Sequence, residues 1–79
     1  MSNLDKYNQI FTEIFEVESN VLNSEFHIDS VDQWDSVTQL TLVNEIEDQF
    51  ELMLDTDDIL NFKSYDEGKK ILDKYDVKI

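Results

Sequence analysis

The chain lacks cysteine altogether, so neither disulfide bonds nor thiolate metal ligands can stabilise its fold. Gly68 is its only glycine, which excludes a glycine-rich loop of the kind that cradles phosphate groups. No apolar run approaches membrane-spanning length, and the first residues lack the basic and apolar regions of a signal peptide. We therefore expect a cytoplasmic protein without a membrane segment, folded as one small domain over residues 1–79.

Residues suited to catalysis or metal binding are also scarce. The sequence shows no Ser-His-Asp set and no paired acid-base site, and its one histidine, His27, has no second metal ligand to accompany it. The acidic stretch 55–58 looks like the start of an EF-hand loop, but Ile59 and Leu60 stand where that loop needs an oxygen ligand and a glycine. We expect neither an enzyme nor a specific metal site.

Basic side chains are missing from most of the chain. Residues 7–62 contain fourteen acidic side chains and no lysine or arginine, whereas residues 63–79 contain five of the six lysines and four acids. The formal net charge is −13. A field of this sign repels nucleic acid and anionic membranes and attracts basic protein surfaces. The expected partners are therefore proteins with basic surfaces, with no binding of nucleic acid or membrane.

The spacing of apolar residues predicts an all-α fold. Spacings of three and four predict helices over residues 3–17 and 36–50, joined by a long loop over 18–34. A short helix is expected from about Asp55 to Phe62 and a last helix over 64–75. The fold is expected to be a small antiparallel helical bundle of three main helices plus one short helix, monomeric, with the long loop between the first and second helices.

The spacing of apolar residues also predicts which side chains are buried. In the 36–50 helix, the stripe expected to face the core is Val37, Leu40, Val43, Ile46 and Phe50, widened by Thr41 and Leu42. The side chains expected to form the core are Phe11, Phe15, Trp34, Val43, Ile46 and Phe50. Gly68 inside the last helix is expected to permit the close approach of another element, and Ser64 with Glu67 has the form of a capping box.

The tripeptide Asp35-Ser36-Val37 stands at the start of the 36–50 helix. Asp35 can act as the N-cap, which places Ser36 at the first helical position with its hydroxyl facing water. The N-terminus of a helix favours an attached anion through its free N–H groups and its macrodipole. Ser36 is therefore a candidate for carrying a phosphate group, although a serine in this place can also be an unmodified surface residue.

Together these features resemble the acyl carrier protein family. The resemblance extends from Leu4 to Tyr75 and includes the first helix, the long loop, Trp34-Asp35-Ser36-Val37, the acidic helix that ends at Phe50, and two closing helices. In that family the serine of an Asp-Ser-Leu signature bears 4'-phosphopantetheine, and Ser36 matches it. The resemblance implies a carrier of acyl groups as thioesters on a covalent arm derived from coenzyme A.

The resemblance also implies the protein's partners. These are a phosphopantetheinyl transferase, which attaches the arm, and acyl-loading and acyl-using enzymes. Asp35 would serve in recognition as well as in capping. The residues expected to contact partners are Asp35, Val37, Val43, Asn44, Glu47 and Asp48.

Departures from the family pattern indicate a specialised biosynthetic pathway. Asn44 stands where fatty-acid carriers usually have methionine, Thr41 where they often have glutamate, and the proline often found before the third helix is absent. Two other functions are compatible with the sequence. An aminoacyl or peptidyl carrier would use the same chemistry at Ser36, and an acidic protein-interaction domain would leave Ser36 unmodified.

Overall fold

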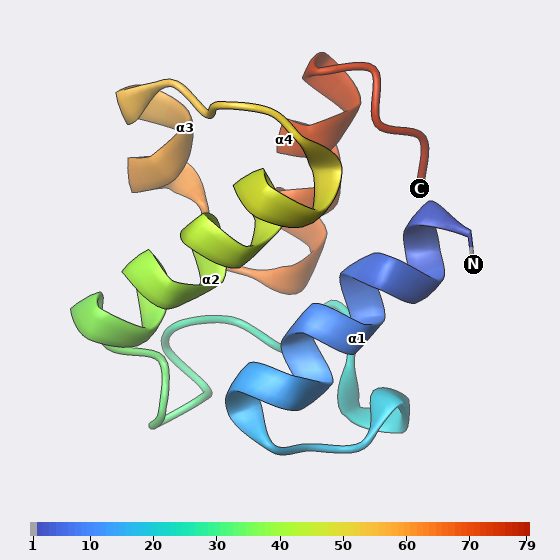
Figure 1. Cartoon of the computed structure of the whole chain (residues 1–79). Coiled ribbons are helices and arrows are strands. Elements are labelled where there is room, and N and C mark those ends of the chain that lie inside the picture. The colour runs from blue at the N-terminus through green and yellow to red at the C-terminus, as the bar shows by residue number, and fades with distance from the viewer. Residues whose placement is uncertain (1) are drawn as a thin grey trace.

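The computed structural model describes residues 2–79 and confirms a small all-α fold (Figure 1). Its helices are α1 (Asn3–Phe15), α2 (Ser36–Phe50), α3 (Thr56–Asn61) and α4 (Tyr65–Lys74), with a 3-10 helix, η1 (Ser19–Val21), in the connection between α1 and α2. Helices α1 and α2 lie side by side and antiparallel, and α3 and α4 complete the bundle. Within residues 2–79, no helix is both long and apolar enough to cross a membrane.

Polar side chains start the main helices at the residues that the sequence indicates. The Asp35 carboxylate accepts from the Thr38 N–H at 2.9 Å, and the Ser64 hydroxyl accepts from the Glu67 N–H at 2.9 Å. These bonds confirm the predicted N-caps of α2 and α4, because each satisfies one of the N–H groups that a helix start leaves free.

The first helix is shorter than the spacing predicts. It ends at Phe15 instead of Val17 because Glu16 adopts the left-handed conformation, with φ 54°. Glu51 ends α2 in the same way, with φ 53°. Both helices are thus terminated by a glutamate in a backbone conformation that more commonly holds glycine.

Aromatic side chains dominate the core. The ring of Phe11 lies at the centre, with six other ring centroids 4.9 to 6.4 Å away. These rings come from α1, from the loop, and from the α3–α4 region, and they belong to Tyr7, Phe15, Phe26, Trp34, Phe62 and Tyr65. The expected burial of Phe11, Phe15, Trp34, Val43 and Ile46 is confirmed, and the loop is held to the core by Phe26 and Trp34.

The predicted buried stripe of α2 is partly wrong. Val37 is 72% exposed and Leu40 is 59% exposed, while Phe50 is only half-buried at the end of the helix. The side chains that α2 buries fully are Leu42, Val43 and Ile46. The buried face is therefore turned toward Leu42, and the first two turns of α2 present their apolar side chains outward.

Gly68 permits the close approach that the sequence predicts. A Cβ atom at this position would collide with the Tyr7 hydroxyl and the Phe62 ring. The Tyr7 hydroxyl donates to the Tyr65 carbonyl at 2.6 Å, so α1 and α4 are in direct contact beside the glycine. Burial raises the pKa of Tyr7 well above its usual value, and the phenol stays neutral as a donor.

Candidate functional site

Ser36 is the first residue of α2, and its side chain is exposed to solvent. Asp35 precedes it as the N-cap, with its carboxylate turned to the Thr38 N–H. Hydrogen bonds from Thr38, chiefly from its backbone, hold the pKa of Asp35 below its usual value. The serine hydroxyl is therefore accessible at a helix start whose cap carries a negative charge at neutral pH.

A groove between α2 and α3 opens beside Ser36. Its volume is about 350 Å³, and its lining residues are Ile28, Ser36, Gln39, Leu40, Ile59, Leu60 and Lys63. Four of these side chains are aliphatic, and Leu60 is 64% exposed at the surface of α3. This groove was not predicted from the sequence, because the apolar spacing of α2 places Leu40 in the core and no pattern singles out Leu60.

Gln39 connects the three segments that surround this groove. Its amide nitrogen donates to the Ile59 carbonyl at 2.9 Å and to the Phe62 carbonyl at 2.6 Å. Its amide oxygen accepts from the Trp34 indole N–H. This role of Gln39 was not predicted from the sequence. The signal for it is its place one turn after Ser36, on the helix face shared with Val43 and Ile46.

A second polar cluster holds α3 against α4. Asp58 is 4% exposed and accepts from the Lys74 ammonium at 2.5 Å and from the Tyr75 hydroxyl at 2.6 Å. The Tyr75 hydroxyl also accepts from the Asp55 N–H at 2.9 Å, at the start of α3. The bonds from Lys74 and Tyr75 lower the pKa of Asp58, and the same carboxylate raises the pKa values of Lys74 and Tyr75.

The residues expected to contact partners are divided between surface and core. Val37, Asn44 and Asp48 are exposed along α2. Glu47 is half-buried, and its carboxylate accepts from the Leu54 N–H at 2.8 Å, so it also fixes the turn after α2. Val43 is 2% exposed and belongs to the core, so its assignment as a partner contact is wrong.

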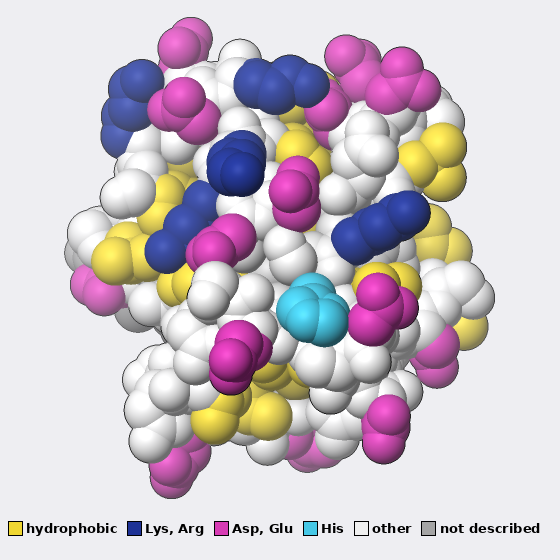
Figure 2. All heavy atoms as spheres, turned by 180° about the vertical axis from the view of Figure 1, so that it is seen from behind, with side chains coloured by type: hydrophobic (Ala, Val, Ile, Leu, Met, Phe, Trp, Pro, Cys, Tyr) yellow, Lys and Arg dark blue, Asp and Glu magenta, His cyan; other side chains and the backbone are white. Residues whose placement is uncertain are grey.

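The lysines occupy a different part of the surface. Figure 2 shows the face turned away from the viewer in Figure 1, where Lys side chains lie among Asp and Glu side chains. A groove of about 530 Å³ on the α3–α4 side is lined by Lys63, Lys70 and Lys74 together with Asp58, Asn61, Glu67 and Ile71. The stretch 63–79, with its five lysines and four acids, therefore forms a local mixture of charges on an otherwise acidic protein.

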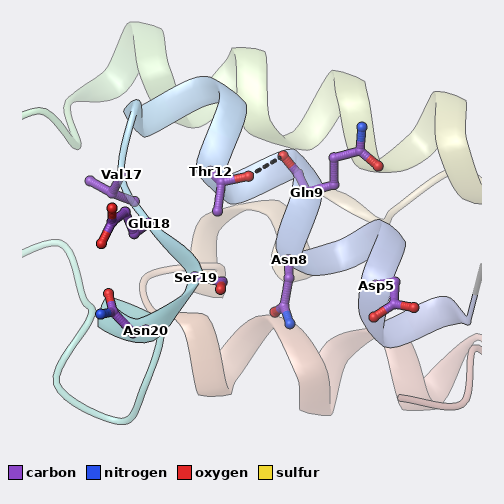
Figure 3. Close-up of a pocket in the computed structure, with 8 residues that line it drawn as sticks. All are labelled: Asp5, Asn8, Gln9, Thr12, Val17, Glu18, Ser19 and Asn20. Atoms are coloured by element: carbon purple, nitrogen blue, oxygen red, sulfur yellow. Dashed lines mark hydrogen bonds between the residues drawn. The ribbon is translucent and has the colours of Figure 1, made fainter.

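A further hollow lies between α1 and η1 (Figure 3). Its volume is about 650 Å³, and polar side chains line it, including Asp5, Asn8 and Glu18. The Thr12 hydroxyl donates to the Gln9 carbonyl of the same helix, and the acids lie apart along the wall. Among residues 2–79, no group of three or more His, Cys, Asp or Glu side chains is arranged to hold a metal ion.

Comparisons with protein-family models, with curated proteins and with solved structures find no match for this chain.

Proposed function

We propose that the chain is an acyl carrier protein that bears 4'-phosphopantetheine on Ser36. The observation that supports this most directly is the exposed Ser36 hydroxyl at the start of α2, capped by Asp35 and bordered by an apolar groove. The combination of an accessible nucleophile, a helix start and an apolar surface at one point suits a covalent arm with acyl cargo.

The residues at this point fit the prosthetic group. The Ser36 oxygen would form a bond to the phosphorus nearer to pantetheine in coenzyme A. The diphosphate bond would break, adenosine 3',5'-bisphosphate would leave, and the hydroxyl proton would go to a base of the transferase. The free N–H groups of the first turn of α2 favour the phosphodiester so formed. When attached, the arm supplies the thiol that carries the cargo, which the chain itself lacks because it has no cysteine.

The groove supports acyl cargo over aminoacyl cargo. Its aliphatic lining includes Leu40, Ile59 and Leu60, and the hydrogen-bonding groups of Gln39 are already engaged with the protein. A charged α-amino group would lose hydration there without gaining a partner, whereas an alkyl chain would be favoured. We place this carrier in the cytoplasm as a monomer that meets transferase and pathway enzymes through basic surfaces.

The decisive experiment is intact-mass measurement after incubation with a phosphopantetheinyl transferase and coenzyme A. The wild-type chain is expected to gain one phosphopantetheine group, and peptide mapping is expected to locate it on Ser36. Ser36→Ala is expected to fold, because the side chain is exposed, and to gain no mass. Ser24→Ala, which also removes an exposed serine hydroxyl, is the matched control and should be modified like the wild type. A Ser36→Ala chain that still accepts the arm would contradict the proposal.

We further propose that this carrier serves a specialised pathway. Asn44 is exposed on α2, where its amide would be buried against any enzyme that expects an apolar side chain there. An unpaired buried polar group costs about 1–3 kcal/mol, which corresponds to roughly a tenfold to hundredfold loss of affinity. Condensing enzymes of fatty-acid synthesis should therefore use the wild-type chain poorly and Asn44→Met better. Equal use of the wild type and a housekeeping carrier would refute this assignment.

An acidic protein-interaction domain is the alternative that one further observation favours. Val37 and Leu40 are exposed on α2 next to the acidic surface, and this is the composition of a docking face. Such a domain would bind a basic partner equally well with Ser36→Ala. Retained binding combined with no modification of the wild type would establish this alternative.

A further inference from the structure

Lys63 stands at the junction of α3 and α4 and lines the groove that contains Ser36. Its backbone is fixed on both sides. The Lys63 N–H donates to the Asn61 carbonyl at 2.9 Å, and its carbonyl accepts from the Ile28 N–H at 2.8 Å. Ile28 belongs to the loop that leads into α2 and lines the same groove. The base of the lysine is therefore held in place relative to Ser36.

Lys63 is the only cationic side chain that lines this groove. The ion pairs found among residues 2–79 involve Lys74 and Lys78, and the Lys69 ammonium lies 4.5 Å from the centre of the Tyr65 ring. The Lys63 ammonium has no carboxylate partner in that described part of the chain. It is thus available to an anion placed in the groove.

An anion on Ser36 would need such a partner. The neighbouring Asp35 is ionised at neutral pH, and residues 7–62 contain no lysine or arginine. A phosphodiester at this position would add negative charge beside a carboxylate on a protein of net charge −13. A nearby ammonium offsets that repulsion, and screening is weaker for charges that share a partly enclosed groove than for separated surface charges.

We infer that the Lys63 ammonium pairs with the phosphodiester of a 4'-phosphopantetheine arm on Ser36. This inference rests on the proposed carrier function. The pairing directs the first atoms of the arm across the groove toward α3, so that the rest of the arm starts above Leu40 and Leu60. Lys63 is a positioning residue in this arrangement, since it contacts the arm and not the thioester.

Comparing the lysines before and after loading tests the contact directly. The NMR chemical shifts of each lysine side chain are measured at one pH on the unmodified protein and on the protein loaded with the arm. A new anion within contact distance should clearly change the NMR chemical shifts of the Lys63 side chain, because its field acts on the ammonium and the adjoining methylene. Lys69, Lys70, Lys74 and Lys78 should change by much less.

Variants supply a second measurement that a purely structural role would not affect. The phosphorus resonance of the loaded protein should relax more slowly in Lys63→Gln, because the phosphodiester then rotates more freely. Lys63→Arg should retain the wild-type relaxation, and so should Lys70→Gln, which removes an exposed lysine from the α3–α4 groove. High salt should reproduce the Lys63→Gln result in the wild type.

The outcomes separate this inference from the carrier assignment. If Ser36 accepts the arm and all lysines shift equally, or Lys63→Gln relaxes like the wild type, the ion pair is refuted and the carrier assignment stands. If Ser36 accepts no arm, both are refuted.

Discussion

Helices α1 and α3 are held in the bundle by different kinds of contact. Helix α1 buries Tyr7, Ile10, Phe11 and Phe15 in the aromatic core. Helix α3 has six residues, and its only fully buried side chain is that of Asp58. Hydrogen bonds from Gln39, Lys74 and Tyr75 hold α3, with the half-buried Ile59 as an apolar contact to the core, while Leu60 faces solvent. Helix α1 therefore belongs to a rigid body around the aromatic core, whereas α3 is attached separately and forms one side of the groove beside Ser36.

The largest expected effect is on the side of α1. Phe11→Ala should lower the free energy of unfolding by about 3–5 kcal/mol, because it removes the ring that six others surround. Urea denaturation followed by far-UV circular dichroism measures this change. Leu60→Ala on α3 is the control and should change stability by no more than about 0.5 kcal/mol. Similar losses for both variants would show that α3 is part of the rigid body.

The next effect is local to α3. Gln39→Leu leaves the carbonyls of Ile59 and Phe62 and the Trp34 indole N–H without their partner, which should cost about 1–3 kcal/mol. Hydrogen exchange should show faster exchange in α3 while the amides of α1 keep their protection. Gln49→Leu is the control, since its amide bonds only to Glu45 on the same exposed face. Uniformly faster exchange throughout the bundle would contradict separate attachment.

The attachment of α3 should depend on pH at both ends of the scale. Because the pKa of Asp58 is lower in the folded protein, its carboxylate stabilises the attachment of α3 fully above the pKa of the unfolded chain, about 3.9. This stabilisation is lost as the pH falls through the pKa of the folded protein. The pKa values of Lys74 and Tyr75 are raised in the folded protein, so their protonated groups stabilise the attachment of α3 fully below about pH 10. This stabilisation is lost as the pH rises through their pKa values in the folded protein.

Exchange rates in α3 measured from acid to alkaline pH test this dependence. In the wild type, α3 should open at both extremes more readily than α1 does, after correction for intrinsic exchange. Asp58→Asn should speed exchange in α3 at neutral pH and remove the further increase that α3 shows at acid pH. Asp73→Asn, which changes an exposed carboxylate, should leave that increase in place. If exchange in α3 still increases at acid pH in Asp58→Asn, the increase is caused by another titrating group.

The smallest effect concerns the acidic surface. Added sodium chloride should raise the melting temperature by a few degrees, because it screens the repulsion among the fourteen acids of residues 7–62. The Asp58–Lys74 contact involves a nearly buried carboxylate, so local opening of α3 should respond less to salt than global unfolding does. A melting temperature independent of salt would show that the acids lie too far apart to repel each other appreciably.

Local signals made much of the fold predictable. The caps at Asp35 and Ser64 depend on residues three positions apart, and the length of α2 follows from a continuous apolar period. The exposure of Ser36 follows from its place after the cap. These features are encoded within one or two helical turns, which is the range that sequence patterns describe well.

The polar anchors of α3 were not predictable in this way. Gln39 bonds to carbonyls 20 and 23 residues away, and Asp58 bonds to side chains 16 and 17 residues away. A polar residue is buried only when such distant partners satisfy it, and the sequence does not show which partners fold next to it. The exposure of Val37 and Leu40 was also not predicted. An apolar stripe on α2 does not show how far along that helix its neighbours extend to cover it.

The glutamates that terminate α1 and α2 leave room to strengthen the protein by engineering. Glu16 and Glu51 occupy left-handed conformations at φ 54° and 53°, where a side chain costs roughly 1 kcal/mol or more relative to glycine. Each also places a negative charge at the end of a helix that favours positive charge. Exchanging either residue for glycine, at sites that do not line the groove beside Ser36, should give a more stable scaffold in which that groove is left as it is.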